Sequence, residues 1–461
     1  MKRKIFLAAL MALFIGGANA QEEKEKTTFK FYGFVRNYAC YDTRESYTSN
    51  SEQFYYMPKN VNEDDAGNDL NAQDNIMLLS ITTRLGLNIS GPNFLGAKTS
   101  AKIESDFAGF GTSNTVLRIR QAYAKMDWKH NSVLVGQAWH PMMGDMMPDV
   151  FSLETGAPFT PFSRTPMVRY DYNNSGVTLT AAALYQFQYT SYGPKDPAKG
   201  DYTSTGSFDY ARNAVVPEIY LQAMYKNGGF QAGVGIDMLT IKPRQSYAVT
   251  ETTKETYYVP AHDETGAPIL DSNGAATFVP VEKSTTDTKT YKCNEAPVLG
   301  FTPTIFMSYK ADRWGIKGRA TYAQNAAHLS MISGYAVTDI NSENGEQEYT
   351  PLESVSGWID ATYKVPLKRG NLQFCCFAGY TKNLGCSKQI VDNIIYMRGE
   401  KGMDYMWRVA PSVLYTHNAM QIGIEYNPTT VAYGTHEGDY KMSNSSTVTN
   451  HRICAMLKYN F

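Results

Sequence analysis

The chain ends with ICAMLKYNF, residues 453–461. Odd positions of this stretch carry Ile453, Ala455, Leu457, Tyr459 and Phe461, and even positions carry Cys454, Met456, Lys458 and Asn460. Alternation with a period of two residues is typical of a β-strand with one apolar face. The pattern runs to the last residue, whereas soluble chains more often end in a frayed polar tail. The C-terminus is therefore predicted to be a structural strand.

Similar alternation recurs upstream and divides the chain into about sixteen predicted strands. They cover approximately residues 29–42, 76–90, 98–110, 116–128, 133–140, 167–172, 177–189, 219–225, 230–241, 298–309, 314–329, 355–365, 372–381, 403–416, 420–433 and 453–461. Many have the length that a tilted membrane strand needs. Beyond residue 20 no apolar run is long enough for a transmembrane helix.

The connections between these segments alternate between short and long. Short turns rich in Asn and Gly, such as residues 173–176 and 227–229, supply the positive φ that tight hairpins need. The longest connection covers residues 242–297. A transmembrane barrel has short turns on one rim and long loops on the other, whereas a soluble sandwich has no reason to sort its loops. The sequence predicts an all-β, closed antiparallel barrel, in which the first and last strands pair.

The two faces of each predicted strand differ in polarity. In residues 76–90, Leu79, Ile81, Leu85, Leu87 and Ile89 are predicted to share the outer face. A Lys or Arg facing lipid at mid-bilayer costs about 2–4 kcal/mol, so the charged faces should line a wet lumen. The candidate lumenal cations are Arg84, Lys102, Arg118, Arg120, Arg169, Lys317, Arg319, Arg408 and Arg452. Aromatic residues near strand ends are predicted to form interfacial girdles, namely Tyr405, Tyr433, Tyr459 and Phe461.

Residues 1–20 have a basic start, a short apolar run and an A-x-A site, which is typical of a signal peptide. We expect a short segment over 21–28 and the barrel over 29–461. Without residues 1–20, 40 basic residues face 44 acidic residues, a net charge of −4, which does not suggest a nucleic-acid partner. The six cysteines match no metal-site pattern, and their spacing does not identify a disulfide pair.

The connection over residues 141–166, PMMGDMMPDVFSLETGAPFTPFSRTP, is unusually apolar for an exposed loop. Together with the signal peptide and the terminal Phe, it makes the chain resemble the sixteen-stranded porins of Gram-negative outer membranes. In that superfamily the third external loop folds into the barrel and narrows the pore. The resemblance implies that Asp145, Asp149, Glu154 and Arg164 belong to a constriction loop, although a plug contact or a trimer contact would also explain the composition.

Among porins, the chain is most similar to the trimeric DcaP-like group. This resemblance implies an outer-membrane homotrimer that passes small hydrophilic solutes, with a preference for small dicarboxylate-type anions. Its lipid-facing barrel would be inserted by the barrel-assembly machinery, with Tyr459 and Phe461 as the assembly signal. Some members of the group carry an N-terminal coiled coil, whereas only residues 21–28 precede the first strand here.

Several alternatives remain open at this stage. The arginines could be structural and pair with Glu104, Asp106 and Glu425 to fill the lumen. An outer-membrane enzyme of lipase or protease type could use His436-Glu437, but no G-x-S-x-G motif accompanies this pair. A surface β-sandwich that binds a partner is a third possibility. Residues 62–69 resemble a calcium loop that has Ala66 at a ligand position. The prediction therefore includes no catalytic residues, no metal site and no cofactor.

Overall fold

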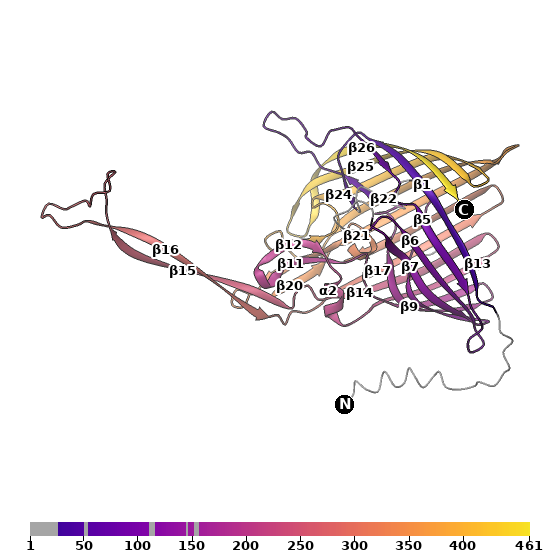
Figure 1. Ribbon diagram of the computed structural model, residues 1–461, viewed down its shortest axis with the longest axis horizontal. Coiled ribbons are helices and arrows are strands. Elements are labelled where there is room, and N and C mark those ends of the chain that lie inside the picture. The colour runs from indigo at the N-terminus through magenta and orange to yellow at the C-terminus, as the bar shows by residue number, and fades with distance from the viewer. Residues whose placement is uncertain (1–25, 50–53, 110–115, 144–145, 152–155) are drawn as a thin grey trace.

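A computed structural model describes residues 26–49, 54–109, 116–143, 146–151 and 156–461, so the predicted signal peptide lies outside the described residues. The strands form one closed antiparallel barrel (Figure 1). Its strands, in order around the wall, are β1 (Thr28–Asp42), β4 (Asn75–Leu79) with β5 (Arg84–Ser90), β6 (Lys98–Asp106), β7 (Arg118–Asp127), β8 (Asn131–Trp139), β9 (Arg164–Asn174), β10 (Val177–Leu184), β13 (Glu218–Asn227), β14 (Phe230–Ile241), β17 (Val298–Lys310), β18 (Trp314–Gln324), β21 (Glu353–Pro366), β22 (Asn371–Gly385), β24 (Met403–His417), β25 (Met420–Glu437) and β26 (Lys441–Asn460). Because β4 and β5 both pair with β1 as halves of one interrupted strand, the barrel has sixteen strands, as predicted. No helix in the described part of the chain is long and apolar enough to cross a membrane.

The barrel closes between its first and last strands, as predicted. β1 and β26 pair in an antiparallel register from Phe34 opposite Asn460 to Asp42 opposite Arg452. At the end of this seam, Gly33 N–H donates to the Phe461 carbonyl at 3.0 Å, and Phe461 N–H donates back at 3.1 Å. No backbone edge of the wall is therefore left open here, which a hydrocarbon environment requires.

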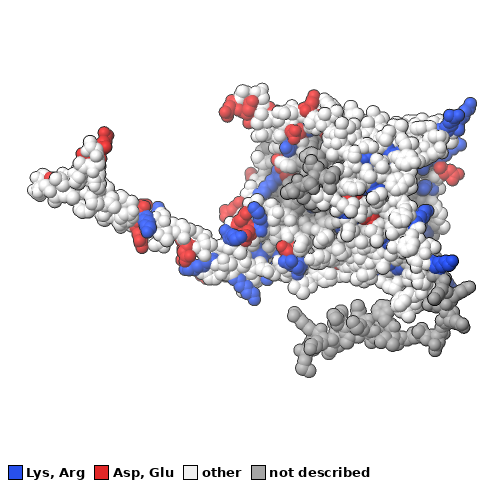
Figure 2. All heavy atoms as spheres, viewed as in Figure 1, with Lys and Arg blue, Asp and Glu red and all other residues white. Residues whose placement is uncertain are grey.

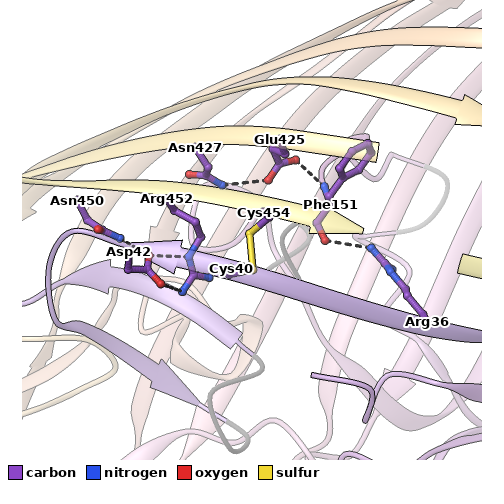
Figure 3. The surroundings of a disulfide bond; sticks show 9 residues. All are labelled: Arg36, Cys40, Asp42, Phe151, Glu425, Asn427, Asn450, Arg452 and Cys454. Carbon is purple, nitrogen blue, oxygen red and sulfur yellow. Dashed lines mark hydrogen bonds and ion pairs between the residues drawn. A yellow bond between two sulfur atoms is a disulfide. The ribbon is translucent and has the colours of Figure 1, made fainter. Parts of the chain in front are cut away.

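A disulfide reinforces this seam. Cys40 of β1 and Cys454 of β26 lie directly opposite each other in the register and are bonded through their sulfur atoms (Figure 3). The pair spans 414 residues of sequence, so spacing alone gave no reason to select it. Both side chains are buried and point to the inner side of the wall, beside Tyr38 and Met456.

Replacing both cysteines by serine (C40S/C454S) is expected to lower the stability of the barrel without preventing its closure. Removal of a disulfide typically costs about 2–4 kcal/mol, but the hydrogen-bonded register of β1 and β26 remains. Heat-dependent mobility on a denaturing gel should show a lower transition temperature for this variant and for reduced wild type. Substitution of the exposed, unpaired Cys376 by serine is the control. A transition unchanged by both treatments would contradict the expected stabilisation.

Inner and outer faces differ as the alternation predicted. Outward side chains such as Ile119, Ile305 and Ile422 are more than half exposed, whereas their strand neighbours are buried or half-buried. Because these apolar residues cover the outside of a closed wall, the exposed face suits lipid.

Two of the predicted faces are wrong. Tyr38 of β1 pairs with Leu79, and Phe34, four residues earlier in β1, pairs with Arg84, five residues later in the second strand. The second strand therefore contains one extra residue between these two pairs, within residues 80–83. Such a bulge reverses the parity of the side chains, and Leu79 therefore points inward with Tyr38. Tyr433 is also not an interfacial residue, because its ring is 3% exposed and its hydroxyl donates to the carbonyl of Pro58.

Short turns gather at one end of the barrel and long loops at the other (Figure 1). The long loops are L1 (residues 43–74), L2 (107–117), L3 (140–163), L4 (185–217), L5 (242–297), L6 (325–352) and L7 (386–402). They carry β2 (Ser46–Ser49), β3 (Phe54–Pro58), β11 (Tyr192–Asp196), η1 (Pro197–Lys199), β12 (Asp201–Gly206), α2 (Asp209–Ala214), β15 (Ser246–Pro260), β16 (Phe278–Lys292), η2 (Ala327–Leu329), β19 (Gly334–Ile340), β20 (Gln347–Pro351) and β23 (Ile395–Met397). The last long connection was predicted wrongly, because β25 and β26 continue as a hairpin and leave only a turn at residues 438–440.

L5 forms a two-stranded arm that projects away from the barrel (Figure 1). Its strands β15 and β16 pair from Ser246 opposite Lys292 to Pro260 opposite Phe278, and most of their side chains are exposed. At the base of the arm, the rings of Tyr247 and Tyr291 stack with centroids 5.7 Å apart. The arm is thus tied to the barrel at its base and touches little else.

Deleting residues 248–290 and joining Tyr247 to Tyr291 through Asn-Gly is expected to leave the barrel folded. The two-residue linker suits a tight hairpin, and the removed residues contribute little to the barrel core. Heat-dependent gel mobility and single-channel conductance should both match wild type. A lower transition temperature would show that the arm packs against the barrel more extensively than these contacts indicate.

The mouth of the barrel at the loop end is packed rather than open. One hydrophobic cluster joins Met57 of L1, Phe159 of L3 and Ile332 of L6 to wall residues such as Phe377 and Met406. The predicted insertion of the third long loop is therefore confirmed, and L1 and L6 enter the barrel as well. Loops that bury apolar side chains against the inner wall replace water in this half of the lumen.

Candidate functional site

All nine predicted lumenal cations lie on the inner face of the wall. On β7, for example, Arg118 and Arg120 are on either side of Ile119, which is 53% exposed and points outward. The same alternation places the other seven inward, namely Arg84, Lys102, Arg169, Lys317, Arg319, Arg408 and Arg452. The structure divides them into groups with different partners.

The first group is a buried network of two arginines and two carboxylates. Arg118 donates to both oxygens of Asp106, at 2.7 and 3.0 Å. Arg120 donates to Glu104 at 2.9 Å and to Asp106 at 2.7 Å. Because neither carboxylate side chain is more than 3% exposed, the network is shielded from water. The pairing that the sequence left open as a structural alternative is therefore present for these two arginines.

Several other cations also lie near carboxylates. Arg84 and Lys102 lie 3.7 and 3.8 Å from oxygens of Glu104. Arg169 pairs with Asp171 at 2.9 Å. Arg452 forms a two-point contact with Asp42 across the disulfide-bonded seam, at 2.8 Å for both bonds (Figure 3). These contacts fix the cations on the wall.

Arg408 anchors two inserted loops. Its side chain is fully buried and donates to the hydroxyl of Thr429, the carbonyl of Ala157 in L3 and the carbonyl of Tyr56 in L1. Its guanidinium also lies over the ring of Phe159, 5.3 Å from the centroid. A planar group with several donors suits such a junction. In this structure Arg408 therefore holds loops and does not present its charge to water.

Phe151 of L3 is clamped by two charged residues on the inner wall (Figure 3). Its N–H donates to a carboxylate oxygen of Glu425 on β25 at 2.6 Å, and its carbonyl accepts from Arg36 on β1 at 3.0 Å. L3 begins after β8, whereas β25 is six strands and β1 four strands away from β8 around the sixteen-strand ring. The loop therefore crosses the lumen.

Two glycines on the wall make room for L3 aromatics. A Cβ added at Gly423 would lie 2.4 Å from the ring of Phe151, and one at Gly379 would lie 2.6 Å from the ring of Phe159. No side chain other than hydrogen fits at either position without moving the loop. The two glycines therefore mark where L3 docks.

Substitution Gly423→Val is expected to displace L3 and raise single-channel conductance. The new side chain meets Phe151, which is on a loop that can move more easily than the wall. Gly357→Ala is a suitable control, because the nearest atom to its added Cβ is 3.5 Å away. If the folded Gly423→Val protein conducts like wild type, Phe151 does not narrow the path.

The predicted constriction residues are not gathered at one point. Asp149 accepts a hydrogen bond from Lys317 at 2.9 Å, and its backbone N–H donates to Asp360 at 2.6 Å. Arg164 is the first residue of β9, fully buried, with its guanidinium 4.8 Å from the ring of Trp139. Asp145 and Glu154 lie outside the described residues. Asp149 thus faces β18 and β21 across the lumen from the network on β6 and β7.

The predicted set of inward cations was incomplete, and Arg36 and Lys458 are two of the residues that it missed. Arg36 was not assigned because both faces of the first strand carry aromatic residues. Lys458 is on the same even-numbered face of the C-terminal strand as Arg452, so the alternation was sufficient to predict that Lys458 points inward. Its ammonium lies 4.3 Å from the centroid of the Phe34 ring.

Together these residues make a cationic wall on neighbouring strands, which we call the lumenal cation cluster: Arg36, Arg84, Lys102, Arg118, Arg120 and Lys458. Among the described residues, three carboxylates contact members of this cluster or Phe151, namely Glu104, Asp106 and Glu425. Asp42 of β1 and Asp127 of β7 pair instead with cations outside the cluster, Arg452 and Lys125. The cluster therefore carries more positive than negative charge.

Below L3, towards the short turns, the lumen widens into a cavity of about 780 Å³. Asp149, Lys317 and Asp360 lie at its L3 side. Four further cations line it, namely Lys226, Lys310, Arg313 and Lys364. A space of this size accepts a small organic solute with water.

Comparison with known proteins agrees with this architecture. Residues 18–181 match a family profile described as DcaP outer membrane protein. Over these residues the chain is similar to that outer-membrane family. Its fold is similar to that of the outer membrane channel DcaP of Acinetobacter baumannii, with a TM-score of 0.57 and 18% identity over 94% of this chain and 97% of that one.

Other outer-membrane proteins align with this barrel over similar lengths. OmpT of Vibrio cholerae is 11% identical, with 95% of this chain and 99% of that chain covered and a TM-score of 0.49. An anion-selective porin from Comamonas acidovorans is 10% identical, with 95% and 100% covered and a TM-score of 0.48. No curated protein matches the sequence.

Three further hypotheses from the sequence can be compared with the structure. His436 is in β25 rather than in a loop, where Nε2 donates to the Asn393 amide oxygen at 3.1 Å and its ring contacts Tyr440. In residues 62–69, which resemble a calcium loop, a carboxylate oxygen of Asp64 accepts hydrogen bonds from the backbone N–H groups of Ala66 and Asn68. The hydrogen bonds from Asn68 hold the pKa of Asp64 below its usual value. The surface β-sandwich is excluded, because the sheet is a single closed barrel.

Proposed function

We propose that the chain is a porin of the DcaP-like group that lets small hydrophilic solutes diffuse passively and favours small organic anions such as dicarboxylates. The observation that supports the proposal is the excess of cations in the lumenal cation cluster. Fixed positive charge along a narrow, partly dry passage attracts anions and repels cations. Arginine adds paired donors that match a carboxylate. Diffusion needs no covalent chemistry, so the proposal includes no catalytic residue and no cofactor.

The positive charge at the short-turn end of the barrel also favours anions over cations. Figure 2 shows basic side chains at this end of the barrel, and Lys226, Lys310, Arg313, Lys368 and Arg369 are exposed there. An anion that passes L3 would therefore meet further positive charge in the cavity of about 780 Å³. The short-turn end is the periplasmic side in the proposed orientation, with residues 21–28 as a short periplasmic segment after signal-peptide removal.

The test is ion selectivity in a planar bilayer. Under a salt gradient, wild type should give a reversal potential of the anion-selective sign, and succinate should compete with chloride. Arg84→Ser with Lys458→Ser should shift the reversal potential toward cations, because these cations are the less tightly paired members of the cluster. Arg212→Ser, in exposed helix α2, is the control. A cation-selective wild type would refute the anion preference, and a protein that forms no conductance steps would refute the channel itself.

We also propose that the chain assembles as a homotrimer in outer-membrane lipid and is inserted by the barrel-assembly machinery. Tyr459 and Phe461, which are exposed at the end of the C-terminal strand β26, support insertion by the barrel-assembly machinery. Light scattering of the detergent-solubilised protein tests the trimer, and a truncation of Phe461 tests the assembly signal through the amount of folded barrel in the membrane. A monomeric wild type, or normal insertion of the truncated chain, would contradict these proposals.

A further inference from the structure

Four buried titratable residues meet on the inner wall, away from the lumenal cation cluster. His140 follows β8 at the start of L3, and His328 is in η2 of L6. Glu218 is the first residue of β13, and Asp237 is in β14. None of the four is more than 3% exposed. They come from four separate parts of the sequence, so no motif marks them.

Their ligating atoms converge. Nε2 of His140 lies 2.7 Å from a Glu218 oxygen and 3.6 Å from Asp237 Oδ1. Nε2 of His328 lies 3.4 Å from the same Glu218 oxygen and 3.3 Å from Asp237 Oδ2. In a tetrahedral zinc site with bonds of about 2.0–2.1 Å, ligand atoms lie roughly 3.3–3.4 Å apart. Three of the four separations are near that value.

Hydrogen bonding leaves this cluster incompletely satisfied. Among the described residues, Oδ1 of Asp237 has no hydrogen-bond partner, although the side chain is 1% exposed. The N–H of Met142 lies 3.1 Å from Nδ1 of His140 and donates to it, so this ring is not doubly protonated. Two buried carboxylates and two imidazoles therefore share one site shielded from water. A divalent cation would give the unpartnered Asp237 oxygen a ligand bond.

We propose that His140, Glu218 and Asp237, with His328 as a fourth ligand, bind a divalent transition-metal ion. The ligating atoms of the first three residues already lie within 4.8 Å of one another. Two imidazoles and two carboxylates suit zinc, which accepts nitrogen and oxygen ligands in a closed tetrahedral site. His328 must move slightly to join them, and no hydrogen bond within the described residues holds its other ring nitrogen.

Metal binding through Nε2 of His140 requires the ring proton to move to Nδ1. The contact with the N–H of Met142 then opens. Loss of one hydrogen bond is small compared with formation of metal–ligand bonds. The bound ion would join the start of L3 and the η2 segment of L6 to the wall at β13 and β14.

The experiment measures zinc binding to the full-length, detergent-solubilised protein after treatment with a chelator. One zinc ion per chain should bind, and zinc should raise the temperature of the heat-dependent gel transition. Asp237→Asn and His328→Gln should each weaken zinc binding by at least about tenfold, because the loss of even an outer-shell partner of a ligand typically costs about 10–100-fold in affinity. Asp171→Asn is the matched control, because it alters another buried wall carboxylate, which contacts Thr180 and Arg169.

Two results would overturn the proposal. The first is a folded wild type that binds no zinc, which would make the cluster a network of hydrogen bonds and ion pairs only. The second is Asp237→Asn protein that binds zinc like wild type, which would place the ion elsewhere. If the variants fail to fold, cobalt bound to wild type provides a second measurement. Tetrahedral nitrogen–oxygen coordination gives intense visible absorption, whereas octahedral surface binding gives weak absorption and would also reject the site.

Discussion

Arg118→Ser with Arg120→Ser is expected to reduce the amount of folded barrel sharply and to shift the selectivity of the remaining channels toward cations. The two arginines satisfy Glu104 and Asp106 in a shielded network. Removing one side of a buried ion pair costs about 3–5 kcal/mol, because the remaining charge is left without a partner. Folded yield and transition temperature report the first effect, and the reversal potential reports the second.

A variant that also carries Glu104→Gln and Asp106→Asn separates the two roles of the arginines. It restores the charge balance, so folding should recover. If the selectivity recovers with it, the arginines serve mainly to neutralise the carboxylates. If folding recovers and the selectivity does not, the arginines act on the permeating ion. Normal folding of the Arg118→Ser/Arg120→Ser protein would show that Arg84 and Lys102 suffice to neutralise the network.

Replacing residues 142–162 of L3 by a short Gly-Ser linker is expected to increase single-channel conductance several-fold. The loop crosses the lumen, with Phe151 held between Arg36 and Glu425. The ring of Phe159 packs on the opposite wall, with its centroid 6.0 Å from that of Phe377. Because conductance grows with the free cross-section of a pore, removing this crossing should have the largest effect of any loop deletion. The linker begins after Pro141, so it leaves His140 in place.

The matched control is the deletion of the L5 arm over residues 248–290, which removes more chain from the loop end but none from the lumen. Planar-bilayer recordings should separate the two proteins clearly. An unchanged conductance in the L3 variant would mean that L1 and L6, which share the cluster of Met57 and Ile332, limit the path instead.

The strand content and the barrel closure followed from sequence because they depend on local alternation. Each wall strand has one face in contact with lipid and one face inside, so polarity alternates along the strand. A single inserted residue is enough to defeat this reasoning, as at residues 80–83, because parity beyond a bulge depends on register with β1. Likewise, the β25–β26 hairpin extends past the apolar segment, where no alternation marks its continuation to Glu437 and from Lys441.

The candidate site was predictable in part. Alternation placed nine cations on the inner face, but it could not predict the carboxylate partner of each one. Each partner depends on which strands are neighbours and on the register between them. Arg408 shows the limit most clearly, because its bonds to Ala157 and Tyr56 are with loops that lie far away in sequence. The four residues of the proposed zinc site also lie far apart in the sequence, so no local pattern could predict that they meet.

By itself, the sequence determined that this chain forms a closed wall of alternating strands with charge inside, because contact with lipid imposes a two-residue period that is readable locally. Only the tertiary structure decided which cysteines pair, which carboxylates neutralise which arginines, and where His140, Glu218, Asp237 and His328 meet. These are contacts between segments far apart in the chain, and the physical reason is that strand register and loop insertion set their distances, which residue type and spacing do not encode.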